Sequence, residues 1–209
     1  MAKYLGPKCK LCRREGEKLM LKGERCYTPK CAIVKKNYPP GIHGPKGRAR
    51  QSSYCIELRE KQKAKRIYNL QEQQFALTFK KARRQKGDAG ENLMKLLETR
   101  LDNAIYRLGL ASSRSEARVL IVHQHFTVND KTVDIPSYQV NTGDIIKIKP
   151  SRKNDKIFVN LTEKLKKFSP PSWLSLDSKE LTAKILHLPA KDEVELKINT
   201  QLIVEFYSR

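Results

Sequence analysis

The sequence contains no apolar run that approaches the roughly 18 residues needed for a membrane-spanning helix. Its first ten residues, MAKYLGPKCK, lack the apolar core of a secretion signal. Phosphate-binding GxxxxGK[ST] loops, nucleophile elbows and HExxH helices are missing, as are internal repeats and low-complexity tracts. We therefore expect a cytoplasmic protein that is not an enzyme.

Acidic residues are scarce, since 22 Asp and Glu stand against 43 Lys and Arg in 209 residues, for a net charge of +21 and a pI near 9.9. Such an excess repels itself unless a polyanion neutralises it. Nucleic acid is therefore the leading partner class, and an anionic membrane surface is the other candidate. Residues 1–50 hold 14 basic and 3 acidic side chains, or +11. We expect this first quarter to bind phosphate most strongly.

The five cysteines indicate a metal or free thiols in a reducing compartment. Cys9 and Cys12 form one close pair, and Cys26 and Cys31 form another after a short loop. Four thiolates in two chelating pairs favour a closed structural zinc site, and an iron–sulfur cluster with the same ligands stays open. Four unrelated thiols or a redox pair are the alternatives. Cys55 is expected to be a small buried residue.

The elements expected before residue 110 are an extended arm and three helices. The arm is residues 38–50, YPPGIHGPKGRAR, because three prolines and three glycines oppose a helix. Ser52 or Ser53 should cap a first helix that runs to Tyr68. Asn69 and Glu72 resemble a capping pair for the second. Leu93, Leu96, Leu97, Leu101, Ala104, Ile105 and Leu108 recur at spacings that predict one long third helix, ended by Gly109.

The pattern after Gly109 predicts a small α+β unit. Ser113 and Glu116 form a capping box for another helix. Residues 126–135 alternate like a hairpin around a tight turn at Asn129-Asp130, and residues 145–149 predict a strand.

Residues 171–209 close the predicted fold. PSWLSLD (171–177), ILHLP (185–189) and the terminal QLIVEFYSR (201–209) all read as strands. The expected fold class is α+β. Its domains are a metal-stabilised N-terminal extension (1–50), a helical middle (51–98) joined by the C-terminal segment (171–209), and an inserted helix-helix-hairpin RNA-binding module (99–162).

The helix after Ser113 is the second candidate site. Arg114 and Arg118, four residues apart, should share one face, opposite a core of Ala117, Leu120 and Ile121. A solvated basic face is the alternative, but so basic a chain favours RNA contact. Arg100, Arg107, Ser113 and Lys131 would extend this surface.

Two short motifs carry less weight. Arg100-Leu101-Asp102 matches a tripeptide of a pseudouridine synthase family, but no separate catalytic domain is present. We interpret Asp102 as a surface charge or the partner of an arginine. His123 and His125 span a change of backbone, which disfavours a metal pair, and His123 is expected to border the RNA surface. The alternatives to a structural RNA-binding protein are an RNA-modifying enzyme and a free ribosome-quality-control factor.

Several long stretches resemble the small-subunit ribosomal protein number four family of bacteria and plastids. They are the four-cysteine amino end, YPPGIHG (38–44), LREKQKAKRIY (58–68), GENLMKLLETRLDNAIYRLGLASSR (90–114), EAR (116–118), TVN (127–129), PSYQV (136–140), GDII (143–146), PSWL (171–174) and LIVEFYSR (202–209). Gln124, Asp130, Asn69 and Cys55 stand where glycine is usual in that family.

The resemblance implies a primary binder of 16S rRNA that nucleates assembly of the body of the small ribosomal subunit. It also implies contact with ribosomal protein number five and other small-subunit proteins, a role in decoding accuracy, an arm near incoming mRNA, and no membrane partner. A plastid location stays open. The cysteines match the zinc-bearing form of the family. Together with the basic pattern, the candidate RNA-binding residues are Lys8, Lys10, Arg13, Arg14, Lys35, Lys36, His43, Lys46, Arg48, Arg50, Arg59, Lys61, Lys63, Arg66, Arg100, Arg107, Ser113, Arg114, Arg118, His123 and Lys131.

Overall fold

The computed structural model describes residues 4–46, 50–153, 155, 157–159, 161–165, 168–178, 180–190, 193–194 and 198–209. The chain divides into two compact units. The first comprises Met1–Leu93 and Leu196–Arg209, and the second comprises Met94–Glu195. None of the helices in the described ranges is both long and apolar enough to cross a lipid bilayer.

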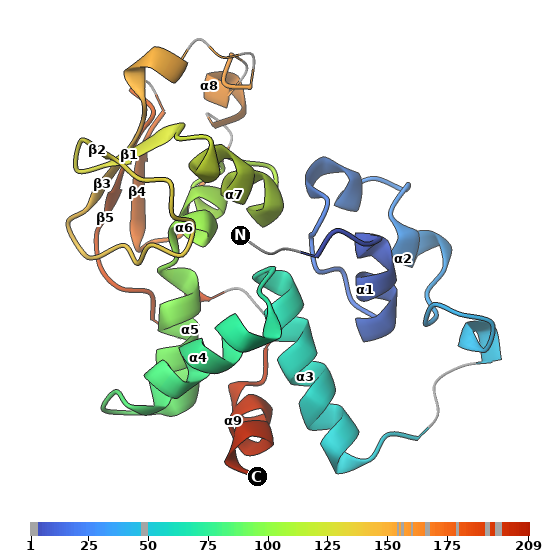
Figure 1. The fold of residues 1–209 in the computed structure, drawn as a ribbon. Coiled ribbons are helices and arrows are strands. Elements are labelled where there is room, and N and C mark those ends of the chain that lie inside the picture. Colours follow the sequence, from blue (N-terminus) through green and yellow to red (C-terminus); the bar gives the residue numbers. More distant parts are fainter. Residues whose placement is uncertain are drawn as a thin grey trace. The chain divides into compact units, whose positions relative to one another are not determined.

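The first unit is helical (Figure 1). Its longest helix begins after Ser52, whose side chain accepts a hydrogen bond from the backbone N–H of Cys55, so the predicted N-cap is confirmed. The elements in chain order are α1 (Lys8–Glu15), η1 (Gly23–Cys26), α2 (Ala32–Lys35), η2 (Gly44–Lys46), α3 (Ser53–Ile67), α4 (Glu72–Arg83) and α9 (Thr200–Ser208), with α5 (Ala89–Glu98) beginning before the boundary of the units.

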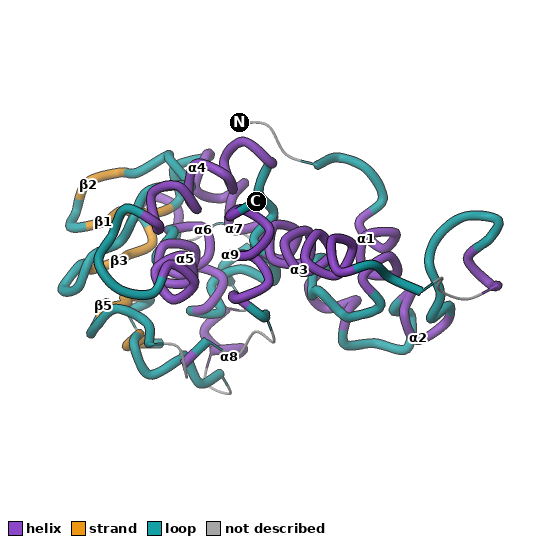
Figure 2. The backbone as a smooth tube through the Cα atoms, turned by 90° about the horizontal axis from the view of Figure 1, so that it is seen from below, coloured by secondary structure: helices purple, strands orange, loops and turns teal. Residues whose placement is uncertain are grey.

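The last helix, α9, corrects the prediction of a terminal strand at 201–209. Asn199 caps it, because its side chain accepts hydrogen bonds from the backbone N–H groups of Gln201 and Leu202. α9 lies along α3 in both views (Figures 1 and 2). The Tyr207 ring stacks 4.5 Å from the ring of Phe79, so packing against the first unit outweighs the strand preference of this run.

The expected capping pair of Asn69 and Glu72 is also wrong. Asn69 has a φ of 54° and lies outside the helix, and α4 begins after Gln71 without a side-chain cap. The Glu72 carboxylate instead accepts hydrogen bonds from Lys61 at 2.6 Å and Lys65 at 2.8 Å. Glu72 therefore joins α4 to α3.

The long third helix that the sequence predicted is divided into two helices, α5 and α6 (Leu101–Arg107). The chain breaks at Arg100, which is extended (φ −69°, ψ 138°) and pairs with Gln139 in an isolated β-bridge. α5 consequently ends at Glu98 and a separate helix starts at Leu101. The remaining helices of the second unit are α7 (Arg114–Val122), η3 (Pro150–Arg152) and α8 (Leu161–Leu165).

A five-stranded antiparallel sheet in the order β2-β1-β3-β5-β4 forms the other layer of this unit (Figures 1 and 2). The predicted hairpin is confirmed, because Asn129 and Asp130 have φ values of 49° and 62° between the first two strands. Thr127 faces both Thr132 and Lys147 in the register. The strands are β1 (Phe126–Val128), β2 (Lys131–Thr132), β3 (Ile145–Ile148), β4 (Leu174–Asp177) and β5 (Thr182–Ile185).

The last two strands correct the expected assignment of segments to domains. Strand β5 pairs with β3, so β4 and β5 extend the sheet of the second unit and do not join the helical segment 51–98. Of the segment 171–209, only the residues from 196 belong to the first unit. Helices and sheet of the second unit share one core, which includes the fully buried side chains of Ile105, Phe126, Ile146 and Trp173.

Candidate nucleic-acid interface and cysteine cluster

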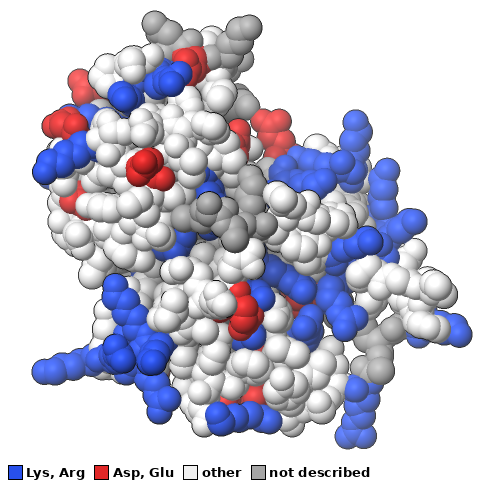
Figure 3. Space-filling view, in the orientation of Figure 1, with Lys and Arg blue, Asp and Glu red and all other residues white. Residues whose placement is uncertain are grey.

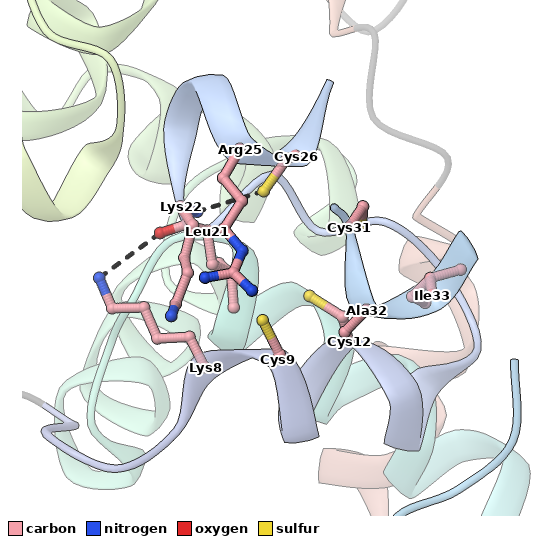
Figure 4. A pocket seen from close by; sticks show the side chains of 10 residues that line it. All are labelled: Lys8, Cys9, Cys12, Leu21, Lys22, Arg25, Cys26, Cys31, Ala32 and Ile33. Atoms are coloured by element: carbon pink, nitrogen blue, oxygen red, sulfur yellow. Dashed lines mark hydrogen bonds between the residues drawn. The ribbon is translucent and has the colours of Figure 1, made fainter. Parts of the chain in front are cut away.

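The four paired cysteines line one cavity in the first unit. α1 carries Cys9 and Cys12, η1 ends in Cys26, and Cys31 directly precedes α2. Figure 4 shows the sulfur atoms of Cys9, Cys12 and Cys26 turned toward this space. Cys26 Sγ accepts a hydrogen bond from the backbone N–H of Lys22 at 3.4 Å. Segments that are separate in the sequence thus place their cysteines around one cavity.

The donor set has the chemistry that zinc prefers. Burial raises the pKa of the Cys12 thiol, a hydrogen bond from the Leu19 backbone opposes this, and the neighbouring cysteines raise the pKa further. A cation among the four sulfur atoms would offset both the burial and the repulsion. All five cysteines are free thiols. Within the ranges that the structure describes, no group of three or more His, Cys, Asp or Glu side chains is close enough to hold a metal ion.

The cysteine-bearing segment is attached to α3 by ion pairs. The Glu15 carboxylate at the end of α1 is buried and contacts the guanidinium groups of Arg59, at 3.3 Å, and Arg66. Glu17 lies 3.0 Å from Lys63 Nζ. These cations therefore hold the N-terminal segment in place.

The predicted RNA-binding residues of α3 are consequently not an open basic face. Arg59, Lys63 and Arg66 pair with glutamates of the N-terminal segment. Lys61 is 4% exposed and lies over the Phe206 ring, 4.4 Å from its centroid, while it donates to Glu72. The sequence shows these cations but not the carboxylates that reach them from distant segments.

The four arginines predicted on the surface of the second unit are buried. Arg100, Arg107, Arg114 and Arg118 are between 2% and 8% exposed. Arg107 lies 3.2 Å from a Glu98 carboxylate oxygen. The prediction of an exposed face opposite the apolar core was wrong, because α7 packs on α6 and buries this face as well.

Asp102 is the centre of this buried group. It accepts hydrogen bonds from Arg100 at 3.1 and 3.0 Å and from Arg118 at 3.1 and 2.6 Å. Arg114 donates to the Asn103 side chain at 2.8 Å and lies over the Tyr106 ring. Asp102 is therefore the partner of two arginines and not a surface charge.

Ser113 is a capping residue. Its hydroxyl accepts a hydrogen bond from the backbone N–H of Glu116 at 3.3 Å, as the capping box predicts. The return contact differs from the prediction, because the Glu116 carboxylate accepts from the backbone N–H of Ser112, at 2.7 Å, and from its hydroxyl. Side chains of this chain therefore satisfy the backbone N–H groups of Ser112 and Glu116 at the start of α7.

The two histidines of VHQH lie in different surroundings. His123 is the exposed C-cap of α7, and Gln124 follows with a φ of 58°. His125 is buried, with Nδ1 3.3 Å from an Asp155 carboxylate oxygen and its ring against Phe158. Burial lowers the pKa of His125 and Asp155 raises it, with a net lowering. His123 alone is placed to meet a partner.

Most predicted cations of the N-terminal segment remain accessible. Lys8 and Arg13 are half-buried, and Arg13 donates to the backbone oxygens of Tyr38 and Pro39. Arg48 lies outside the described residues. The exposed members of the predicted set are Lys10, Arg14, Lys35, Lys36, His43, Lys46, Arg50, His123 and Lys131.

The sequence prediction missed five exposed cations at the end of α4. Figure 3 shows lysine and arginine side chains gathered over this part of the first unit, at the lower left. Five of the seven residues 80–86 are basic, and this density could have predicted the cluster from the sequence. We call this group the α4 cationic end; its members are Lys80, Lys81, Arg83, Arg84 and Lys86, all exposed.

The chain is similar to known proteins along its whole length. Residues 3–98 match the family described as Ribosomal protein S4/S9 N-terminal domain, and residues 99–146 match the S4 domain. The chain is 54% identical to the small ribosomal subunit protein uS4 of Caldicellulosiruptor saccharolyticus and 51% identical to those of Heliobacterium modesticaldum and Clostridioides difficile. Each comparison spans 209 residues and the full length of both chains.

Proposed function

The chain belongs to the family of the small ribosomal subunit protein uS4, and from this premise we propose that it binds 16S rRNA directly and nucleates assembly of the body of the small subunit. It has a structural role and is not an enzyme. The observation that carries the proposal is the match of both parts of the chain to relatives of the same length. The net charge of +21 supports a polyanionic partner.

The proposed mechanism is recognition of folded RNA by shape and phosphate. Exposed cations of residues 4–46 supply charge, while the ion pairs of Glu15 and Asp102 fix the segments that carry the binding surfaces. Cations on segments that are already fixed within one unit meet phosphates without a large ordering cost. Two units in one chain can hold separate RNA helices together.

We also propose that Cys9, Cys12, Cys26 and Cys31 hold one structural zinc ion. Their shared cavity and the burial of Cys12, Cys26 and Cys31 support the proposal, and an iron–sulfur cluster is the alternative with the same ligands. A bound metal would cross-link a segment that has little apolar core of its own.

The remaining partners are proposed from the family resemblance. The arm with Lys46, Arg48 and Arg50 would lie near incoming mRNA. Contact with ribosomal protein number five would link the chain to translational accuracy. The site of action would be the small ribosomal subunit in the cytoplasm, or in a plastid.

Binding to purified 16S rRNA at several salt concentrations tests the central proposal. We expect log affinity to fall steeply with log salt, with a slope of close to one unit for each phosphate that the protein neutralises. A slope near zero would defeat the electrostatic mechanism. Salt-washed small subunits should retain one copy per particle, whereas a transient ribosome-bound factor would be washed away.

A further inference from the structure

The α4 cationic end differs from the basic cluster of α3 in whether its side chains form ion pairs. Within the described ranges, none of its five side chains forms an ion pair with a carboxylate. Asp88 is the nearest acid in the sequence. Its Oδ2 accepts a hydrogen bond from the backbone N–H of Glu91 at 2.8 Å, in the first turn of α5. Five like charges therefore lie within seven residues without compensation.

Helix α3 provides the contrast. Its five cations, Arg59, Lys61, Lys63, Lys65 and Arg66, each meet a glutamate of this chain. Those charges contribute to the fold, whereas the charges of the α4 cationic end repel one another. The helix C-terminus favours cations by only about 0.3–1 kcal/mol each. The fold alone does not account for so many.

The backbone beneath these cations is held in one shape. The side-chain amide of Asn92, 7% exposed, is shared among the backbone oxygens of Ala82, Gln85 and Lys86, at 3.5, 3.4 and 3.2 Å. Ala82 belongs to the last turn of α4, whereas Gln85 and Lys86 follow the end of the helix, so one amide ties the loop to the helix. A buried polar group thus fixes the loop before any ligand is present.

From these observations we infer that the α4 cationic end is an RNA phosphate-binding site. It would take the sugar-phosphate backbone of a structured RNA, because the cations are dense and fixed in place. Among residues 80–86 the one apolar side chain is that of Ala82, which is buried, whereas apolar and aromatic side chains dominate the core of a protein interface. The inference rests on the proposed function and adds a contact surface to it.

Two matched variants test the location of the site. The first replaces Lys80, Lys81 and Lys86 by Gln. The control replaces by Gln three lysines of the second unit that lie outside the S4 domain match, Lys149, Lys153 and Lys184. Both lower the net charge by three. Each full-length protein is titrated with 16S rRNA and with an unrelated structured RNA of equal length, at several salt concentrations.

We expect the first variant to lose about two to three units of salt slope and on the order of 10- to 100-fold in affinity at 0.1 M salt, and the control to lose less than half of that slope. Equal losses in both variants, or no loss in either, would overturn the inference. If the unaltered protein fails to prefer 16S rRNA, the proposed function fails. A reduced slope of the first variant on either RNA would still support the site.

Asn92→Ala tests the fixed backbone separately, since it removes the amide and no charge. We expect weaker binding with an unchanged salt slope. Circular dichroism checks that the helices are intact. An unchanged affinity in a folded Asn92→Ala protein would show that the loop needs no such support.

Discussion

Asp102 and Arg118 form a buried ion pair between consecutive helices, with 2.6 Å between Oδ2 and Nη2 and side chains that are 3% and 5% exposed. Arg100 shares the same carboxylate from the start of α6. One negative charge thus serves two guanidinium groups within the second unit. Removal of such a partner costs far more than an exposed pair contributes.

Asp102→Ala should therefore destabilise the second unit by about 3–5 kcal/mol, because two buried guanidinium groups lose their counter-charge. Urea unfolding followed by the fluorescence of Trp173, the only tryptophan and 1% exposed, measures this. Asp130→Asn is the control, because it removes the charge of an exposed pair with Lys147 and keeps a residue type that tolerates the φ of 62°. It should change stability by less than about 1 kcal/mol. Similar losses in both variants would contradict the buried network.

Glu15→Gln should loosen the cysteine-bearing segment from α3. Arg59 and Arg66 then lose a buried carboxylate, and we expect a cost of about 1–3 kcal/mol and faster tryptic cleavage within residues 4–46. Glu17→Gln is the matched control, because the Glu17 side chain is 54% exposed. The prediction fails if both variants are cleaved at the same rate.

Stability of the second unit should decrease in acid through Glu193. Hydrogen bonds from the Ala190 backbone, the Ser172 hydroxyl and the His187 ring lower the pKa of this carboxyl from 4.5 to about 2. Because the folded-state pKa is the lower one, the stabilisation is complete above pH 4.5 and is lost as the pH falls toward 2. The difference in unfolding midpoint between the unaltered protein and Glu193→Gln should therefore shrink from pH 6 to pH 3. A constant difference would contradict this assignment.

Gln124→Gly should stabilise the second unit by up to about 1 kcal/mol. Gln124 has a φ of 58°, a conformation that L side chains adopt at a cost and glycine does not. Asn129 has a similar φ of 49°, but its side chain hydrogen-bonds to Asp144 and to the Ile145 backbone. Asn129→Gly should therefore destabilise the unit in the same Trp173 fluorescence assay. Stabilisation by both variants would show that backbone strain alone decides.

Freshly purified protein should contain about one mole of zinc per chain. The variant in which Ser replaces Cys9, Cys12, Cys26 and Cys31 should contain none. Cys55→Ser, the control, should leave the metal content unchanged. Elemental analysis decides, and less than half a mole of metal per chain would defeat the structural-site proposal. Iron in place of zinc would indicate the cluster.

Features set by a few neighbouring residues were predictable from the sequence. Ser52 and Ser113 cap the helices that the prediction assigned to them, and Asn129-Asp130 makes the hairpin turn. Each depends on contacts within about three residues. The hairpin strands and the strand at Ile145–Ile148 follow from local alternation.

Features set by distant contacts were not predictable. The basic pattern of α7 predicted an RNA-binding face, with a solvated face as the alternative. The face is buried instead, because Arg118 pairs with Asp102, 16 residues earlier in the sequence. The terminal run is rich in strand-forming residues, yet Asn199 and the packing of Tyr207 make it a helix. The carboxylates that form ion pairs with the α3 cations lie up to 51 residues away in the sequence.

The sheet order has a consequence for the making of the protein itself. The inner strand β3 keeps one edge open until β5 is synthesised, and α3 lacks its packing partner until α9 is complete. During vectorial synthesis both units must therefore wait for the final third of the chain. Truncated translation products would present a bare strand edge and an uncovered helix, the surfaces that promote aggregation and attract chaperones.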